Sequence, residues 1–210
     1  SPFMSLQKKV MKGKISDLLN VRIRENFKPK QTLKSYLKNS KIDIKPIIFQ
    51  TLFTLKKLDD EYKGFRHNNL NTSNIYLTEH DMQEYQLNDN KYYLDFNDTF
   101  VKIGNFENAY IPKMFKSSNL DNDNFKYMKN KSFDAHFFLN NLINEININN
   151  VKNSSKFKKF INKYLPKKYR GKGKNNYYMS DDYDMVSIDE MLQDEYFDEF
   201  KIKNSKMINV

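Results

Sequence analysis

Apolar residues in the middle of the chain recur with the period of an α-helix. Between residues 43 and 62 they fall on one broad face, because residues three and four apart lie on the same side of a helix. These residues are Ile44, Ile47, Ile48, Phe49, Leu52, Phe53, Leu55 and Leu58. The pattern predicts a long buried helix over 43–62. Asp43 is expected to cap its start, Pro46 lies in the first turn where proline is tolerated, and Gly64 follows its end.

Shorter segments on either side carry weaker versions of the same signals. Thr32 is a candidate cap for a short helix, and Ser187 with Glu190 forms a capping-box pattern before a second apolar run. Alternating or short apolar runs predict strands. The predicted elements are helices over 33–37, 133–146, 157–165 and 187–200, and strands over 75–77, 92–96 and 100–103, with a polar insertion at 80–91 and a loop-like stretch at 108–131. The chain is therefore expected to be mainly α with a small β element at 75–104.

The length of 210 residues favours a single domain with a sizeable core, to which 17 Phe and 14 Tyr contribute. Absence of Cys excludes disulfides and thiolate metal sites, and the three His are too scattered to suggest a zinc site. No apolar run is long enough for a membrane helix, and the first residues show no signal-peptide pattern. An intracellular, cytoplasmic location is therefore expected.

Charge is unevenly distributed. The net charge is +10; residues 152–174 carry ten Lys or Arg and no acid, whereas residues 181–199 carry nine Asp or Glu and no base. Two interpretations remain open: the two regions attract each other within the domain, or 152–174 is a docking patch for an acidic peptide or nucleic acid. Within that region, residues 167–174 are expected to be exposed.

Two polar stretches follow the long predicted helix. The first, residues 65–77, reads FRHNNLNTSNIYL, and the second, residues 101–107, reads VKIGNFE. A third stretch, at 132–139, is largely apolar and reads SFDAHFFL. In this order they resemble the protein kinase core, in which an H-R-D-L-x-x-x-N loop precedes a strand and a D-F-G turn. The resemblance is closest to the divergent kinase-like proteins of large DNA viruses, which often carry an F-R-H-N-D-L loop and a long insert before the D-F-G strand. It implies a protein kinase C-lobe-like fold.

The resemblance assigns roles to five residues. His67 corresponds to the scaffold histidine of the loop, and Asn69 takes the position of the aspartate base. Asn74 and Asn105 take the positions of the magnesium ligands. Asp134 corresponds to the buried aspartate that holds the backbone of the catalytic loop.

Two departures from the kinase pattern affect activity. An amide at Asn69 has no useful basicity near neutral pH, so it cannot accept a proton as a carboxylate does. An amide at Asn105 removes an anionic oxygen that magnesium prefers. Glu107 also replaces the glycine of the turn. Together these changes argue against phosphate transfer.

The sequence further lacks the phosphate-binding parts of a kinase. Its five Gly, at positions 13, 64, 104, 171 and 173, form no Gly-rich loop ahead of the core, and no Val-Ala-Ile-Lys-like strand is present. We expect a C-lobe without most of its N-lobe, from a fragment or a shortened gene. Its expected divisions are a hinge-like and first-helix region at 1–40, a core helix, loop and strands at 43–107, an activation-segment-like loop at 108–131, and C-terminal helices at 132–203.

Three functional hypotheses follow. The first is a catalytically impaired kinase-like protein, a pseudokinase, that acts as a binding or scaffold module with a protein partner and no cofactor. The second is the C-lobe of an active Ser/Thr kinase whose N-lobe lies outside this chain, which would require ATP and Mg²⁺. The third is a basic nucleic-acid-associated protein.

Overall fold

The computed structural model describes residues 29–80, 83–94, 99–113, 115–116, 130–167, 170–171 and 185–201. Residues 1–28 of the hinge-like and first-helix region expected at 1–40 lie outside these residues, as does most of the basic stretch at 167–174. Within the described parts, no helix is long and apolar enough to cross a membrane.

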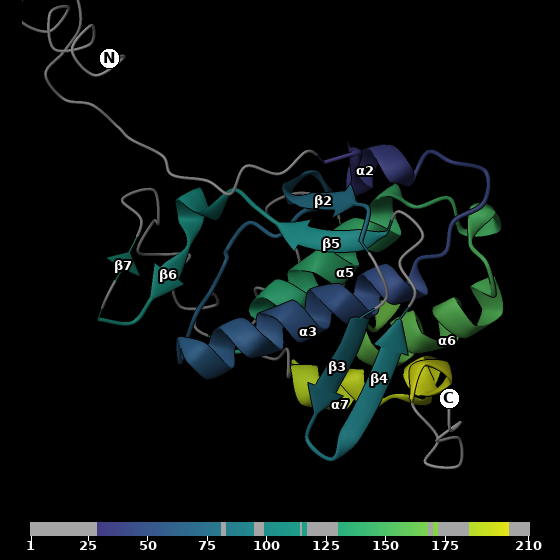
Figure 1. Cartoon of the computed structure of the whole chain (residues 1–210). Helices are drawn as coiled ribbons and strands as arrows, with labels where there is room; N and C mark the ends of the chain where they lie inside the picture. Colours follow the sequence, from purple (N-terminus) through teal and green to yellow (C-terminus); the bar gives the residue numbers. More distant parts are fainter. Residues whose placement is uncertain are drawn as a thin grey trace, which may run out of the picture.

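One long helix, α3 (Lys45–Glu61), forms the centre of the fold (Figure 1). It confirms the helix predicted over 43–62, and Pro46 lies in its first turn. The predicted cap was wrong. Ile44 is the N-cap residue, and its side chain makes no capping hydrogen bond. Asp43 lies one residue too early and pairs with Lys152 at 3.5 Å. The chain turns at Gly64, which has a φ of 84°.

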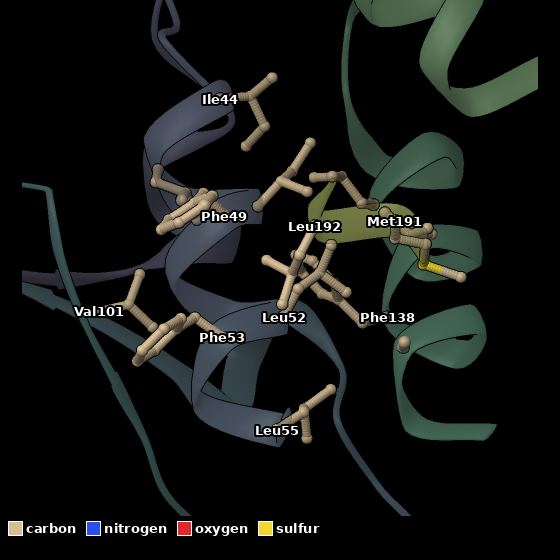
Figure 2. Close-up of a cluster of buried hydrophobic side chains, with 14 of the residues drawn as sticks. Ile44, Phe49, Leu52, Phe53, Leu55, Val101, Phe138, Met191 and Leu192 are labelled. Carbon is tan, nitrogen blue, oxygen red and sulfur yellow. The ribbon is translucent and has the colours of Figure 1, made fainter. Parts of the chain in front are cut away.

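Buried side chains project from two sides of α3 (Figure 2). Phe49 and Phe53 lie toward Val101, whereas Leu52 lies toward Phe138, Met191 and Leu192 on the opposite side. All of them belong to one core cluster. The broad apolar face of α3 therefore reflects burial between a sheet and a group of helices.

The sheet on one side of α3 has three antiparallel strands in the order β1-β2-β5. These are β1 (Gln31–Thr32), β2 (Ile75–Thr78) and β5 (Phe100–Ile103). Ile75 pairs with Ile103 and Thr78 with Phe100. β1 leads directly into α2 (Leu33–Tyr36), which Thr32 caps as predicted by accepting a 3.2 Å hydrogen bond from the Ser35 N–H.

The side chain of Gln50 takes the place of a strand at the outer edge of β5. Its Nε2 donates to the Thr99 carbonyl at 2.9 Å, and its Oε1 accepts from the Val101 N–H at 2.9 Å. Gln50 is buried on α3. The helix thereby fixes the position of the start of β5, which forms the first part of the second polar stretch.

The polar insertion expected at 80–91 is wrong in its extent, because part of it forms a β-hairpin. Strands β3 (Gln83–Leu87) and β4 (Asn90–Leu94) pair in antiparallel fashion around a turn at Asn88, which has a φ of 52°. Tyr85 and Tyr92 pack against Phe49 of α3, with ring centroids 5.6 and 4.8 Å apart. The hairpin is thus part of the core and lies across one face of α3 (Figure 1).

The other helices of the described residues complete the domain. They are α5 (Phe133–Glu145), α6 (Ser154–Tyr164) and α7 (Ile188–Leu192), with single-turn 3-10 helices η1 (Thr72–Asn74), η2 (Phe106–Asn108), η3 (Ile148–Asn150) and the longer η6 (Glu195–Phe200). The capping box is confirmed, since Ser187 Oγ accepts from the Glu190 N–H at 3.2 Å. The single helix predicted over 187–200 is wrong, because Asp194 starts a new element by accepting a 2.9 Å hydrogen bond from the Tyr196 N–H.

The loop-like stretch at 108–131 also contains a short hairpin. β6 (Tyr110–Ile111) pairs with β7 (Phe115–Lys116). Tyr110 and Arg66 exchange two backbone hydrogen bonds of 2.8 Å. The segment after the second polar stretch therefore lies beside the start of the first.

Candidate functional site

Asp134 joins α5 to the polar loop after α3. Its Oδ2 accepts a 2.6 Å hydrogen bond from the His67 N–H, and its Oδ1 accepts a 2.8 Å hydrogen bond from the Asn68 N–H. Asp134 lies in the first turn of α5, where the N-terminal end of the helix favours a negative side chain. The contact expected from the sequence between Asp134 and this loop is therefore present.

Asp134 is buried. Burial raises its pKa, while the neighbouring His67 ring and the two backbone donors act in the opposite direction. A carboxylate that holds two backbone N–H groups satisfies donors for which no water is available. The local shape of the loop thus depends on a residue 67 positions later in the chain.

His67 links the loop to the second polar stretch. Its Nδ1 accepts from the Asn69 N–H at 3.3 Å, so the proton lies on Nε2, which is 3.0 Å from the Gly104 carbonyl. Burial lowers the pKa of this histidine, which favours the neutral ring. His67 therefore has a structural role here as a neutral imidazole bridging two loops.

Four asparagines form a continuous hydrogen-bonded group at this site, in which Asn74 is buried and Asn69, Asn71 and Asn105 are half-buried. Asn105 Nδ2 donates to Asn74 Oδ1 at 3.2 Å, and Asn74 Nδ2 donates to the Asn69 carbonyl at 2.7 Å. Asn71 Nδ2 donates to Asn69 Oδ1 at 2.9 Å. The structure thus brings His67, Asn69, Asn74, Asn105 and Asp134 together, and Asn71 joins them without having been predicted.

Backbone conformations at the site could not be read from the sequence pattern. Asn68 and Asn105 have φ angles of 60° and 62°, the left-handed region that asparagine tolerates better than most side chains. Gly104 is required for a different reason, since a Cβ there would lie 2.8 Å from Cε2 of Tyr76. The frequency of Asn in this stretch was the available signal for these turns.

An aromatic side chain covers one side of His67. The rings of Phe106 and His67 are 5.0 Å apart, and Phe106 is 43% exposed. The ring of Phe65 also contacts Phe106, with centroids 6.3 Å apart. The site therefore has an exposed aromatic residue beside its amides.

The cluster of asparagine side chains provides hydrogen-bond donors and acceptors but contains no carboxylate. Asparagine oxygens are neutral acceptors, and each of the side-chain oxygens of Asn69 and Asn74 already accepts from a neighbouring amide. Across the described ranges, no group of three or more His, Asp or Glu side chains is placed to hold a metal ion. Glu107 follows this group on η2 and is exposed. The arrangement can bind polar groups and keep the two loops in register.

The charged regions expected at 152–174 and 181–199 meet at α6 and η6. Lys163 Nζ is 2.7 Å from Asp194 Oδ2, and Lys159 pairs with Glu195. Asp194 also accepts a 2.8 Å hydrogen bond from the Tyr164 hydroxyl. This favours attraction within the domain for these two lysines, whereas the predicted docking patch for nucleic acid or an acidic peptide stays a prediction.

Comparison with known proteins shows a similarity to a viral protein. The chain is 28% identical to a protein of Acanthamoeba polyphaga mimivirus that is named as a putative serine/threonine-protein kinase, over an alignment of 112 residues that covers 47% of the chain. The chain spans about a quarter (24%) of that protein's length. No family model matches the chain. The similarity supports a kinase-like relationship.

Proposed function

We propose that this chain has the fold of a protein kinase C-lobe and acts as a binding or scaffold module without phosphate transfer. The observation that carries the proposal is the cluster formed by the side-chain amides of Asn69, Asn74 and Asn105. It lies where the kinase resemblance places a base and two metal ligands, next to the bonds from Asp134 to the loop.

The chemistry of these amides is the physical reason. A kinase base must accept a proton from a hydroxyl, and an amide does not do so near neutral pH. Mg²⁺ favours anionic oxygens, and the Asn74 oxygen is already bonded to the Asn105 amide. A site of this kind keeps the shape of the loops and loses the groups that react.

The first prediction concerns catalysis. The unmodified chain is expected to transfer no radiolabelled phosphate from ATP to a mixed Ser/Thr peptide substrate. The double variant N69D/N105D is also expected to be inactive, because positioning of the phosphates supplies most of kinase catalysis and this sequence has no Gly-rich loop. Transfer by the unmodified chain, above a preparation that lacks it, would contradict the proposal.

The second prediction concerns nucleotide binding. Millimolar MgATP is expected to leave the melting temperature unchanged, with MgCl₂ alone as the control. Saturation to a hundred times the dissociation constant would add about 2.7 kcal/mol to the free energy of unfolding, which is readily measured. A clear upward shift would support the alternative, the C-lobe of an active Ser/Thr kinase that uses ATP and Mg²⁺. The greater length of the mimivirus protein keeps that alternative open.

A further inference from the structure

The β3–β4 hairpin has two outer edges that differ. The edge of β4 is covered where Tyr92 forms an antiparallel bridge with Lys201. The edge of β3 has no strand partner among the described residues, since the hairpin forms a separate two-stranded sheet. An unpaired strand edge presents a row of backbone donors and acceptors that another chain can use.

The open edge of β3 adjoins an apolar groove of about 320 Å³. Its apolar lining comes from α3, β3 and β5, and consists of Phe53, Leu58, Tyr62, Tyr85, Phe100 and Val101. Figure 1 shows β3 on the side of the hairpin nearer the C-terminal half of α3. A strand added at this edge would therefore lie next to the groove.

Two side chains of the groove are only partly covered or hydrogen-bonded by the described residues. Gln83 Oε1 is buried and accepts no hydrogen bond from the described residues. Tyr62, at the end of α3, is 40% exposed although it is a large aromatic residue. A buried acceptor without a donor costs free energy, and exposed tyrosines in a concave apolar site are characteristic of binding surfaces.

We propose that an extended peptide segment of a partner protein adds to the outer edge of β3 and inserts apolar side chains into this groove. Backbone hydrogen bonds to β3 would supply affinity. Alternate side chains of the peptide would face the groove and supply specificity, as in other cases of strand addition. The inference does not depend on whether the chain transfers phosphate, so its failure would leave the proposed function untouched.

Selection from a phage library of random peptides, roughly twice the length of β3, tests this on the full chain. We expect selected peptides to carry β-branched or aromatic residues at alternate positions. Their affinity, measured by fluorescence anisotropy, is expected to fall at least about tenfold in Y62A, as for a binding hot spot. The groove-filling variant T54R should abolish binding. Y93A removes a tyrosine that is 45% exposed on β4 and outside the groove, so it should change affinity by less than about twofold.

Hydrogen exchange provides a second readout that is specific to strand addition. The turn has two residues, so Leu87 and Asn90 exchange backbone bonds and the N–H groups of Glu84 and Gln86 point outward. Bound peptide should slow exchange at these two amides. Failure to select any peptide, affinities unchanged in both Y62A and T54R, or unchanged exchange at Glu84 and Gln86 would each overturn the proposal.

Discussion

Replacing Asp134 with alanine is expected to lower the free energy of unfolding by about 4 kcal/mol. The substitution leaves the N–H groups of His67 and Asn68 buried without an acceptor, and each such group costs about 1–3 kcal/mol. D134N retains one acceptor oxygen and should lose roughly half as much. Urea unfolding followed by circular dichroism measures both variants.

The control for this prediction is D198A. Asp198 pairs with Lys201 at the surface, where an ion pair contributes little, so its loss is expected to cost less than about 1 kcal/mol. Equal stability of D134A and D198A would show that the loop does not depend on Asp134.

Lowering the pH from 7 to 4.5 is expected to destabilise the protein, with His136 as a major cause. Its ring is fully buried on α5, and burial lowers its pKa to about 4, whereas the carbonyl of Val186 acts in the opposite direction. The unfolded chain binds a proton at this histidine below about pH 6.5, while the folded protein stays neutral down to about pH 4. The contribution is present above pH 6.5 and is lost as the pH falls. The loss of stability from this histidine reaches about 3 kcal/mol near pH 4.

The variant H136Q isolates this contribution, because other titrating groups are common to both proteins. The free energy of unfolding of H136Q should depend less steeply on pH between 6.5 and 4.5, by up to about 1.4 kcal/mol per pH unit. H80Q changes an exposed histidine and serves as the control. If H136Q and the unmodified chain show the same slope, the ring of His136 does not stay neutral in the folded protein.

Elements with a long apolar period could be predicted from the sequence. The helices α3, α5 and α6 each bury a continuous face, so the apolar spacing alone locates them to within a few residues. The link from Asp134 to the loop came from the order of the motifs. A contact between residues so far apart leaves no periodic signal.

Elements that depend on few inward side chains could not be predicted. β3 turns only Tyr85 and Leu87 toward the core, and its turn is Asn-Asp rather than the stronger Asn-Gly. The break between α7 and η6 was missed because Ser187 and Asp194 are both capping residues, and the apolar pattern continues past the second. At the site, the residue types were predicted, but neither the bonds among the asparagines nor the left-handed backbone at Asn68 and Asn105 follow from the spacing of the motifs.

The pairing of Thr78 with Phe100 has a consequence for how this fold can change over evolutionary time. The connection at 79–99 leaves the sheet and returns to it at neighbouring positions. The length of this connection has little effect on the pairing of β2 with β5, since each doubling of a loop costs only about 0.6 kcal/mol in closure entropy. A lineage can therefore lengthen or shorten this connection while Asn74 and Gly104 keep their places, provided that Tyr85 and Tyr92 still cover Phe49. New recognition properties can arise at β3 independently of the asparagine loop, and related chains are free to differ most in this insert.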